Sequence, residues 1–121
     1  MKRKIKSQRQ LRIGEQIKHL VSELLILGDF NNSKIREVSI TVTEVSLSPD
    51  LKNASIFVIP QNKDKNIVKF LNEESFIFKK AIANKLKLRH VPRIFFYFDP
   101  SFDYAQEIEK LLKDPKVAKD L

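Results

Sequence analysis

The side chains that could carry out acid–base or metal chemistry are few in this chain. The sequence contains no cysteine and two histidines. His19 has Glu15 four residues before it and Glu23 four residues after it, a spacing that brings a carboxylate and an imidazole together on one helix face. A surface ion pair explains this pattern more simply than a metal or acid–base site. We therefore predict no metal site here.

The remaining candidates do not predict catalysis either. His90 is expected at the end of a helix, where a cation suits the helix dipole. The neighbours Glu73 and Glu74 are expected to form a solvated helix start rather than an acid–base pair. A glycine-rich phosphate loop is excluded because the two glycines, Gly14 and Gly28, lie far apart. The sequence predicts a binding protein rather than an enzyme.

Positively charged residues are concentrated in two segments. The chain of 121 residues has a net charge of +8, with seven lysines and arginines in residues 1–18 and six in residues 79–93. The acid found within these segments is Glu15. Lysine and arginine bind nucleic acid by neutralising phosphates and releasing counterions. The predicted contacts are Arg9, Arg12, Lys79, Lys80, Lys85, Lys87, Arg89 and Arg93.

Two other interpretations of this charge stay open. A charged helix face is often only a solvated face that keeps the protein soluble. A membrane is less supported, because neither basic segment pairs its lysines with an exposed aromatic wedge. Uncharged apolar runs such as Leu24 to Leu27 are also far too short to span a bilayer. Two basic segments in one small domain favour nucleic acid, with contacts mainly to phosphate because most of the side chains are lysines.

These basic residues must be positioned by the elements of one domain. Ser7, with Gln10 three positions later, matches a capping box and predicts the start of a helix that ends near Leu27. Gly28 then fits the C′ position of that helix. The basic residues 1–6 are expected to form a flexible tail.

A β-hairpin is predicted after this helix. Apolar residues alternate from Val38 to Val42, which indicates a strand with one buried face. Their parity then shifts near Glu44, which predicts a β-bulge or the end of the strand. The run from Ala54 to Ile59 is expected to form the returning strand.

The second basic segment is predicted to lie on a helix that leads into a strand. Phe78 and Ile82 recur at helical spacing, and Val91-Pro92 is expected to end the helix. The nearly continuous apolar run from Ile94 to Phe98 predicts a strand that is covered on both faces. Its aromatic side chains are therefore assigned to the core rather than to a stacking platform for bases.

The complete predicted order is α-β-β-α-α-β followed by a C-terminal helix. It includes a short helix near residues 67–71, and the weaker helical pattern over residues 101–112 supplies the last helix. The domain is expected to span residues 7–112, followed by a polar tail over residues 113–121.

Several stretches together resemble a known family. The run from Leu88 to Asp99 resembles the leucine-arginine, proline, aromatic-strand and aspartate signature of the ribosome-binding factor A family. Residues 12–17 resemble that family's first helix, and residues 42–45 and 49–58 resemble its hairpin. The resemblance covers about residues 8–112. It implies an α+β fold, a type II KH-like domain in which a three-stranded sheet packs against helices.

The resemblance implies a bacterial ribosome-biogenesis factor. Such a protein binds the free 30S ribosomal subunit, contacts 16S rRNA near its 5′-terminal helix and assists late rRNA maturation, most importantly in the cold. The resemblance also implies a protein without enzymatic activity or cofactor, whose release is assisted by ribosome-assembly GTPases. The basic N-terminus has no apolar stretch behind it, so we expect a cytoplasmic protein. We expect a monomer.

The segment that should orient the basic helix departs from the family pattern. KH domains clamp a nucleic-acid backbone with a Gly-x-x-Gly loop between two helices, and this family is expected to replace that loop with an Ala-x-Gly kink. The matching residues here are Glu73, Glu74 and Ser75. If the kink requires a left-handed residue, Asn72 is the expected one, because asparagine tolerates positive φ. The adjacent carboxylates argue against phosphate contact at the kink.

Two alternatives to ribosome binding stay open from the sequence. The chain could be a KH-like module that binds another single-stranded RNA or DNA. It could also be a protein-interaction module in the ribosome-assembly pathway, with its positive charge serving solubility.

Overall fold

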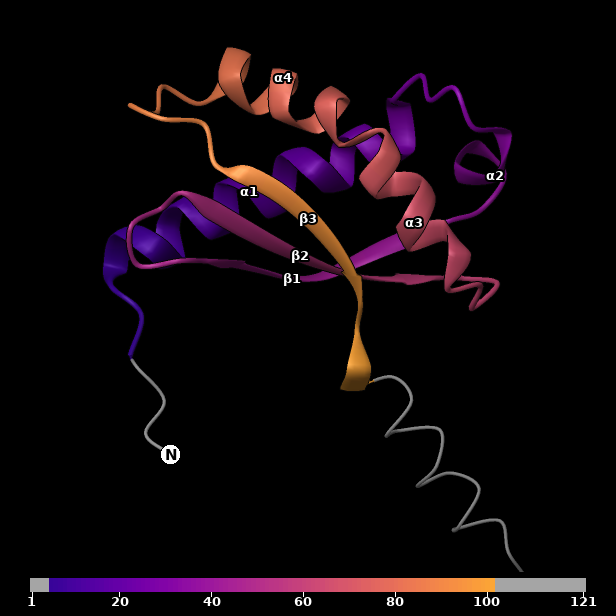
Figure 1. Ribbon diagram of the computed structural model, residues 1–121, viewed down its shortest axis with the longest axis horizontal. Coiled ribbons are helices and arrows are strands. Elements are labelled where there is room, and N and C mark those ends of the chain that lie inside the picture. Colours follow the sequence, from indigo (N-terminus) through magenta and orange to yellow (C-terminus); the bar gives the residue numbers. More distant parts are fainter. Residues whose placement is uncertain (1–4, 102–121) are drawn as a thin grey trace, which may run out of the picture.

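The computed structural model describes residues 5–101 of the chain (Figure 1). Apart from its first residue, the C-terminal helix predicted over residues 101–112 lies outside the described residues. The polar tail predicted over residues 113–121 and most of the basic N-terminal tail also lie outside them.

The described elements follow the predicted order. They are α1 (Gln8–Leu27), α2 (Ser33–Arg36), β1 (Ile40–Leu47), β2 (Asn53–Pro60), α3 (Asn66–Glu73), α4 (Ser75–Lys85) and β3 (Arg93–Phe98). The sheet has the order β1-β2-β3, with β1 antiparallel to β2 and β2 parallel to β3. This arrangement agrees with the predicted α+β fold class. The four-residue helix α2 was not predicted; the Asn32 side chain begins it by accepting a hydrogen bond from the Lys34 amide.

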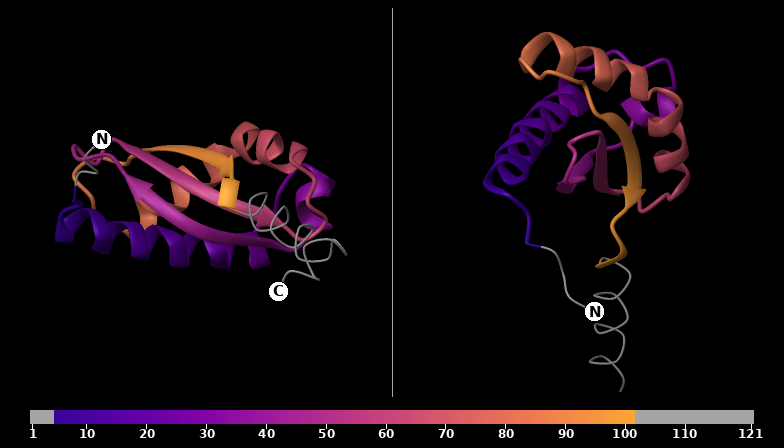
Figure 2. Two further views of the ribbon diagram at one scale, coloured as in Figure 1. Left: turned by 90° about the horizontal axis from the view of Figure 1, so that it is seen from below. Right: turned by 60° about the vertical axis from the view of Figure 1, so that its left-hand side comes forward.

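Figure 2 shows α1, α3 and α4 on one face of the sheet, where the hydrophobic core lies. Near the centre of the core, the Phe78 ring of α4 lies 5.5 Å from the Phe30 ring and 4.8 Å from the Phe96 ring of β3. Removing these apolar surfaces from water is the main contribution to stability. The same contacts fix α4 against β3, the two elements that carry the second basic segment.

The start of α1 confirms the predicted capping box, and its end differs from the prediction. The Ser7 hydroxyl accepts a hydrogen bond from the Gln10 amide (3.1 Å), and the Gln10 side chain accepts one from the Ser7 amide (2.7 Å). Gly28 follows the last helical residue with an extended backbone (φ −70°, ψ 150°) instead of the left-handed conformation typical of a C′ glycine.

The strands confirm the predicted change of parity in the hairpin. The pairing of β1 with β2 shifts register between Val42 and Glu44, which marks the β-bulge. Because one extra residue flips the side chains that follow, Leu47 faces the core together with Val42. Both strands therefore keep one face toward the core, although Ile40 and Val45 of β1 are only partly buried.

The prediction that β3 is covered on both faces is wrong. Ile94 and Phe96 are buried, whereas Phe95 and Tyr97 are 40% and 46% exposed. Continuous apolarity suggests two buried faces, but the layer of helices covers only one face of the described sheet. Half of the aromatic side chains of β3 therefore face solvent.

The predicted end of α4 is also wrong. The helix ends at Lys85, and Leu86 has an extended backbone (φ −108°, ψ 126°). Pro92 sets a limit beyond which a helix cannot continue, but it does not require the helix to extend that far. Residues 86–92 are irregular, so His90 does not lie at a helix end.

Candidate nucleic-acid interface

A buried carboxylate organises the junction between α3 and α4. Glu74 joins the two helices with φ −108° and ψ 21°, and it is only 6% exposed. Its side-chain oxygens accept hydrogen bonds from the backbone amides of Asn31 (2.6 Å) and Asn32 (3.1 Å). The prediction that both carboxylates are solvated is therefore wrong for Glu74, which is buried. Glu73 is exposed, as predicted.

Asn72 was the residue expected to have a left-handed backbone if the kink required one, and it does not have that conformation. It lies inside α3, and the described non-glycine residues with positive φ are Leu51 and Lys63. Its side chain instead binds the backbone of Phe96 in β3. The Asn72 Nδ2 donates to the Phe96 carbonyl (3.0 Å), and Oδ1 accepts from the Phe96 amide (2.8 Å).

These anchors determine which face of α4 reaches solvent. Glu74 fixes the start of the helix, and Phe78 and Ile82 on its inner face are fully buried. Lys79 and Lys80 lie between these two core residues in the sequence, and both are exposed. The tertiary contacts of one short helix therefore present its lysines to solvent.

All eight predicted contact residues are exposed, but they come from different elements. Arg9 and Arg12 lie on α1, and Lys79, Lys80 and Lys85 lie on α4. The other three are Lys87 and Arg89 in the irregular segment after α4, and Arg93 as the first residue of β3.

The structure gathers two of these residues in a shallow cavity of about 340 Å³, which we call the basic hollow. It is lined by Lys52, Lys79, His90, Val91 and Arg93. Three cationic side chains therefore come from the loop before β2, from α4 and from the start of β3. Such a group can hold a phosphate by charge and by several N–H donors at once.

A smaller hollow of about 150 Å³ adjoins the basic hollow, because His90 lines both. Arg9 of α1 and Arg89 also line it, so it brings together the two basic segments of the sequence. Asp50 lines the same hollow. The hydroxyl of Ser48 and the backbone amide of Lys52 hold the pKa of Asp50 below its usual value, so this carboxylate stays negative beside the arginines at neutral pH.

The turn before β2 gives Lys52 its place in the basic hollow. The Ser48 hydroxyl donates to Asp50 (2.6 Å), and the Lys52 amide donates to the same carboxylate (3.0 Å). The Lys52 carbonyl then accepts from the Arg93 amide (2.8 Å). Because β2 and β3 are parallel, the residues that precede β2 lie beside the start of β3.

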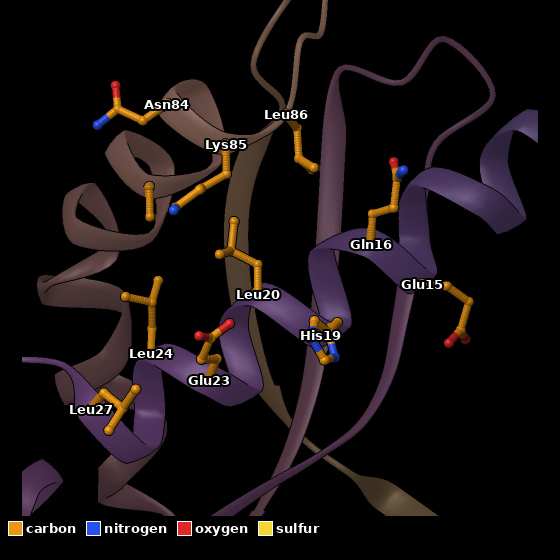
Figure 3. A pocket seen from close by; sticks show the side chains of 11 residues that line it. Glu15, Gln16, His19, Leu20, Glu23, Leu24, Leu27, Asn84, Lys85 and Leu86 are labelled. Carbon is orange, nitrogen blue, oxygen red and sulfur yellow. The ribbon is translucent and has the colours of Figure 1, made fainter.

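Sequence reasoning missed Lys52, because it stands alone between the two basic segments. A prediction that the second and third strands pair in parallel would have placed it beside Arg93. Four predicted residues line neither hollow: Arg12, Lys80, Lys85 and Lys87. Lys85 instead lines a groove between α1 and α4 together with Glu15 and Glu23 (Figure 3).

The outer face of the sheet carries exposed aromatic side chains. The rings of Phe57 and Tyr97 lie 5.6 Å apart on neighbouring strands, and Phe95 is beside them in the register of β3. These rings are on the face opposite the core. The assignment of all the strand's aromatic residues to the core is therefore corrected.

Residues 5–101 contain neither a metal-binding cluster nor a membrane-spanning helix. Within that range, no group of three histidine, cysteine, aspartate or glutamate side chains is arranged to hold a metal ion. None of the described helices combines the length and apolarity needed to cross a membrane.

Comparison with known proteins gives consistent matches. The family model described as Ribosome-binding factor A matches residues 9–112. A protein of that name from Novosphingobium aromaticivorans is 38% identical over 96% of this chain and 87% of its own length. One from Rhodopseudomonas palustris is 43% identical over 95% of this chain and 85% of its own length.

Solved structures match the fold. The crystal structure of ribosome-binding factor A from Thermus thermophilus superimposes with a TM-score of 0.61 at 22% identity, covering 74% of this chain and 94% of that one. A homology model of the Thermus thermophilus protein, fitted into a cryo-electron microscopy map of a 30S complex, gives a TM-score of 0.59 at 22% identity. It covers 72% of this chain and 91% of that one.

Proposed function

This chain belongs to the ribosome-binding factor A family, and we propose that it binds the free small ribosomal subunit through the basic hollow and assists late maturation of 16S rRNA. The relatives' shared name supports binding to the ribosome. A Thermus thermophilus member has been placed in a map of a 30S complex, which supports the small subunit as the partner.

The observation that carries the proposal is the convergence of Lys52, Lys79 and Arg93 in one hollow. These residues are distant in sequence, and each is exposed. Their donors suit the phosphates of a folded RNA, where contacts to the backbone fix position without reading the bases. Counterion release then supplies much of the affinity.

The adjoining hollow extends this surface but carries charges of both signs. Arg9 and Arg89 favour an anion, whereas the ionised Asp50 disfavours one. We therefore expect phosphates to prefer the basic hollow. The contacts predicted for Arg12, Lys80, Lys85 and Lys87 stay predictions, as does any role of the kink in binding RNA.

The finer parts of the proposal rest on the family. They are contact near the 5′-terminal helix of 16S rRNA, release assisted by assembly GTPases, and action as a monomer in the cytoplasm. The maturation role is tested by sequencing the 5′ end of 16S rRNA from cells that lack the protein. Extended, unprocessed ends that return to normal when the gene is restored are the expected result, and normal ends would exclude this role.

The binding site is tested with two triple variants that remove the same charge. One replaces Lys52, Lys79 and Arg93 in the basic hollow by glutamine. The control replaces the exposed residues Lys34, Arg36 and Lys69 of α2 and α3, at the other end of the molecule in Figure 1. Co-sedimentation with purified small subunits is measured at several salt concentrations.

The hollow variant is expected to lose about 10-fold to 100-fold in affinity, because each lost phosphate contact removes a charge-assisted hydrogen bond. The control variant should lose much less. Equal losses would mean that overall charge rather than the hollow determines binding. Tight binding of the wild type to unrelated single-stranded oligonucleotides, without binding to subunits, would favour a general nucleic-acid module instead.

A further inference from the structure

A groove of about 700 Å³ lies between α1 and α4 and shares no residue with the basic hollow, although Lys85, one of the predicted RNA contacts, lines it. Leu20, Leu24 and Leu27 line it from α1, and Ala81 and Leu86 line it from the opposite wall. Figure 3 shows Leu20 and Leu24 projecting from α1 toward α4, and Leu86 extending from the opposite side. We call this cavity the α1–α4 groove.

The groove exposes apolar surface at its end near the C-terminus of α1. Leu27 is 75% exposed there. Leu20, Leu24 and Leu86 are only partly buried. A continuous apolar surface rimmed by polar residues marks an interaction site more often than an isolated exposed leucine does.

The rim formed by α1 is acidic, although the whole protein is basic. Glu15 and Glu23 both line the groove from α1, with His19 between them. Lys85 and Asn84 line it from α4. A phosphate would meet two carboxylates at the α1 rim, whereas a lysine or arginine side chain would pair with them. The groove therefore differs in charge from the basic hollow.

We propose that the α1–α4 groove binds an amphipathic helix of a partner protein, with an apolar face and with lysine or arginine along the edge that faces α1. The lining residues of α1 extend from Glu15 to Leu27, or about 18 Å at about 1.5 Å per residue. This length receives three turns of a helix, which present apolar anchors at positions i, i+3 or i+4, and i+7.

The different charges of the two rims also determine how the partner helix is oriented. Its basic edge lies against Glu15 and Glu23, and its other edge, beside Lys85, is neutral or acidic. The overall charge of +8 does not prevent this pairing. Screening limits the repulsion beyond about 8 Å at physiological salt, whereas a direct ion pair is much shorter.

The probe for this proposal is a synthetic helical peptide of about 18 residues, which spans the groove with some excess at each end. It carries leucines at helical spacing and lysines along one edge, and its counterpart carries glutamates in place of the lysines. Fluorescence anisotropy gives both affinities for the full chain. Backbone amide shifts in NMR spectra of the chain give the location of binding.

The lysine peptide is expected to bind about tenfold more tightly than the glutamate peptide, because two exposed ion pairs are replaced by two repulsive contacts. Amide shifts are expected within residues 15–27 and 81–86. Replacing Glu15 and Glu23 together by lysine should reverse the preference between the peptides. Both side chains are exposed, so this variant should fold normally.

Two neighbouring residues of α1 supply a matched control for the apolar contacts. Leu27 lines the groove and Ile26 does not, although Ile26 is 82% exposed. Leu27→Ser is expected to weaken the lysine peptide several-fold, and Ile26→Ser should leave its affinity unchanged. Thermal unfolding of both variants checks that the fold is intact.

Several results would overturn the proposal. They are equal affinity for the two peptides, amide shifts outside the groove, and equal effects of Leu27→Ser and Ile26→Ser. Dimerisation through the groove would also overturn it, by assigning the surface to a second copy of the chain. Because Leu27→Ser and Ile26→Ser retain both the basic hollow and the net charge, their association with small subunits should be unchanged, and that measurement tests the proposed function separately.

Discussion

At the residue scale, Glu74 holds the junction between two helices through its side chain. Its carboxylate binds the amides of Asn31 and Asn32 in a place where water is largely excluded. Hydrogen bonds to an ionised acceptor are stronger than those between neutral groups. The bend therefore needs no left-handed residue, and the chain has none there.

We expect Glu74→Ala to lower the free energy of unfolding by about 2–3 kcal/mol, because two buried amides lose their acceptor. Glu74→Gln should cost less, since one amide oxygen still accepts. Urea denaturation measures both. Glu73→Ala, which changes an exposed neighbour, is the control and should stay within about 0.5 kcal/mol of the wild type. Equal midpoints for Glu73→Ala and Glu74→Ala would contradict this account.

Asp99 is expected to make stability depend on pH. The Thr43 hydroxyl, and then the side chain and backbone of Ser101, hold the pKa of Asp99 below its ordinary value of 3.8, against the opposing effect of burial. The Ser101 amide and hydroxyl donate at 2.8 and 2.7 Å. A lowered pKa stabilises the fold above the ordinary value, and this contribution disappears as the pH falls through the folded-state pKa.

Asp99→Asn should therefore be less stable than the wild type at neutral pH, by about 0.5 kcal/mol because solvent screens the site. The difference should shrink as the solution becomes strongly acidic. Urea midpoints measured across the acid range test this. A difference that grows with falling pH would contradict the sign.

At the scale of elements, Asn72 attaches α3 to the free edge of the sheet. Strand β3 pairs with β2 along one edge. Along its other edge, the side-chain amide of Asn72 forms hydrogen bonds with the backbone amide and carbonyl of Phe96. An uncovered strand edge invites pairing with other chains. The side chain thus stabilises the fold and also protects the edge.

Asn72→Ala is expected to lose about 1–2 kcal/mol of stability, corresponding to two hydrogen bonds. Asn72→Asp should lose at least as much, since its second carboxylate oxygen would face the Phe96 carbonyl oxygen and two acceptors repel each other. Chemical denaturation gives the stabilities, and light scattering gives the tendency to aggregate. If Asn72→Asp proved as stable as the wild type, the hydrogen bond from Asn72 to the Phe96 carbonyl would have no value.

The end of α1 leaves no space for a side chain at Gly28. A Cβ atom added there would lie 2.9 Å from the Phe30 ring and closer still to the Leu24 carbonyl oxygen. We expect Gly28→Ala to destabilise the protein by about 1–3 kcal/mol through this overpacking. Gly14→Ala is the comparison: its Cβ would lie 3.1 Å from the Val45 carbonyl oxygen, and helix propensity offsets part of that cost. Thermal unfolding should therefore show the larger loss for Gly28→Ala.

At the scale of the whole molecule, the basic hollow and the α1–α4 groove differ in charge although α4 lines both. The basic hollow joins the loop before β2 with α4 and β3, and the acidic rim of the α1–α4 groove lies on α1. The proposed RNA contact and the proposed contact with a partner helix use different surfaces, so one does not exclude the other.

The affinity for small subunits should fall steeply with salt. We expect the triple glutamine variant of Lys52, Lys79 and Arg93 to depend less on salt. The slope of the logarithm of the binding constant against the logarithm of the salt concentration should become shallower by roughly two to three, because each phosphate contact releases about one counterion. Sedimentation at a series of salt concentrations gives both slopes. Parallel slopes for wild type and variant would show that these side chains do not contact phosphates.

The sequence by itself determined the features that depend on near neighbours. The cap of Ser7 and Gln10 and the bulge near Glu44 follow from patterns only a few residues long, as do the two basic segments. Hydrogen bonds within a turn and the alternation of a strand act over that range, so short patterns are sufficient to predict them.

Only the tertiary structure decided the features that depend on contacts between distant segments. Lys52 joins Lys79 and Arg93 because β2 and β3 are parallel, and Glu74 is buried because the loop after α1 crosses the junction of α3 and α4. Leu86 leaves the helical path well before Pro92. In such places the free energy of packing exceeds the local preferences of the chain. The residue types alone therefore predicted that the protein has basic segments, but not which basic side chains would lie together.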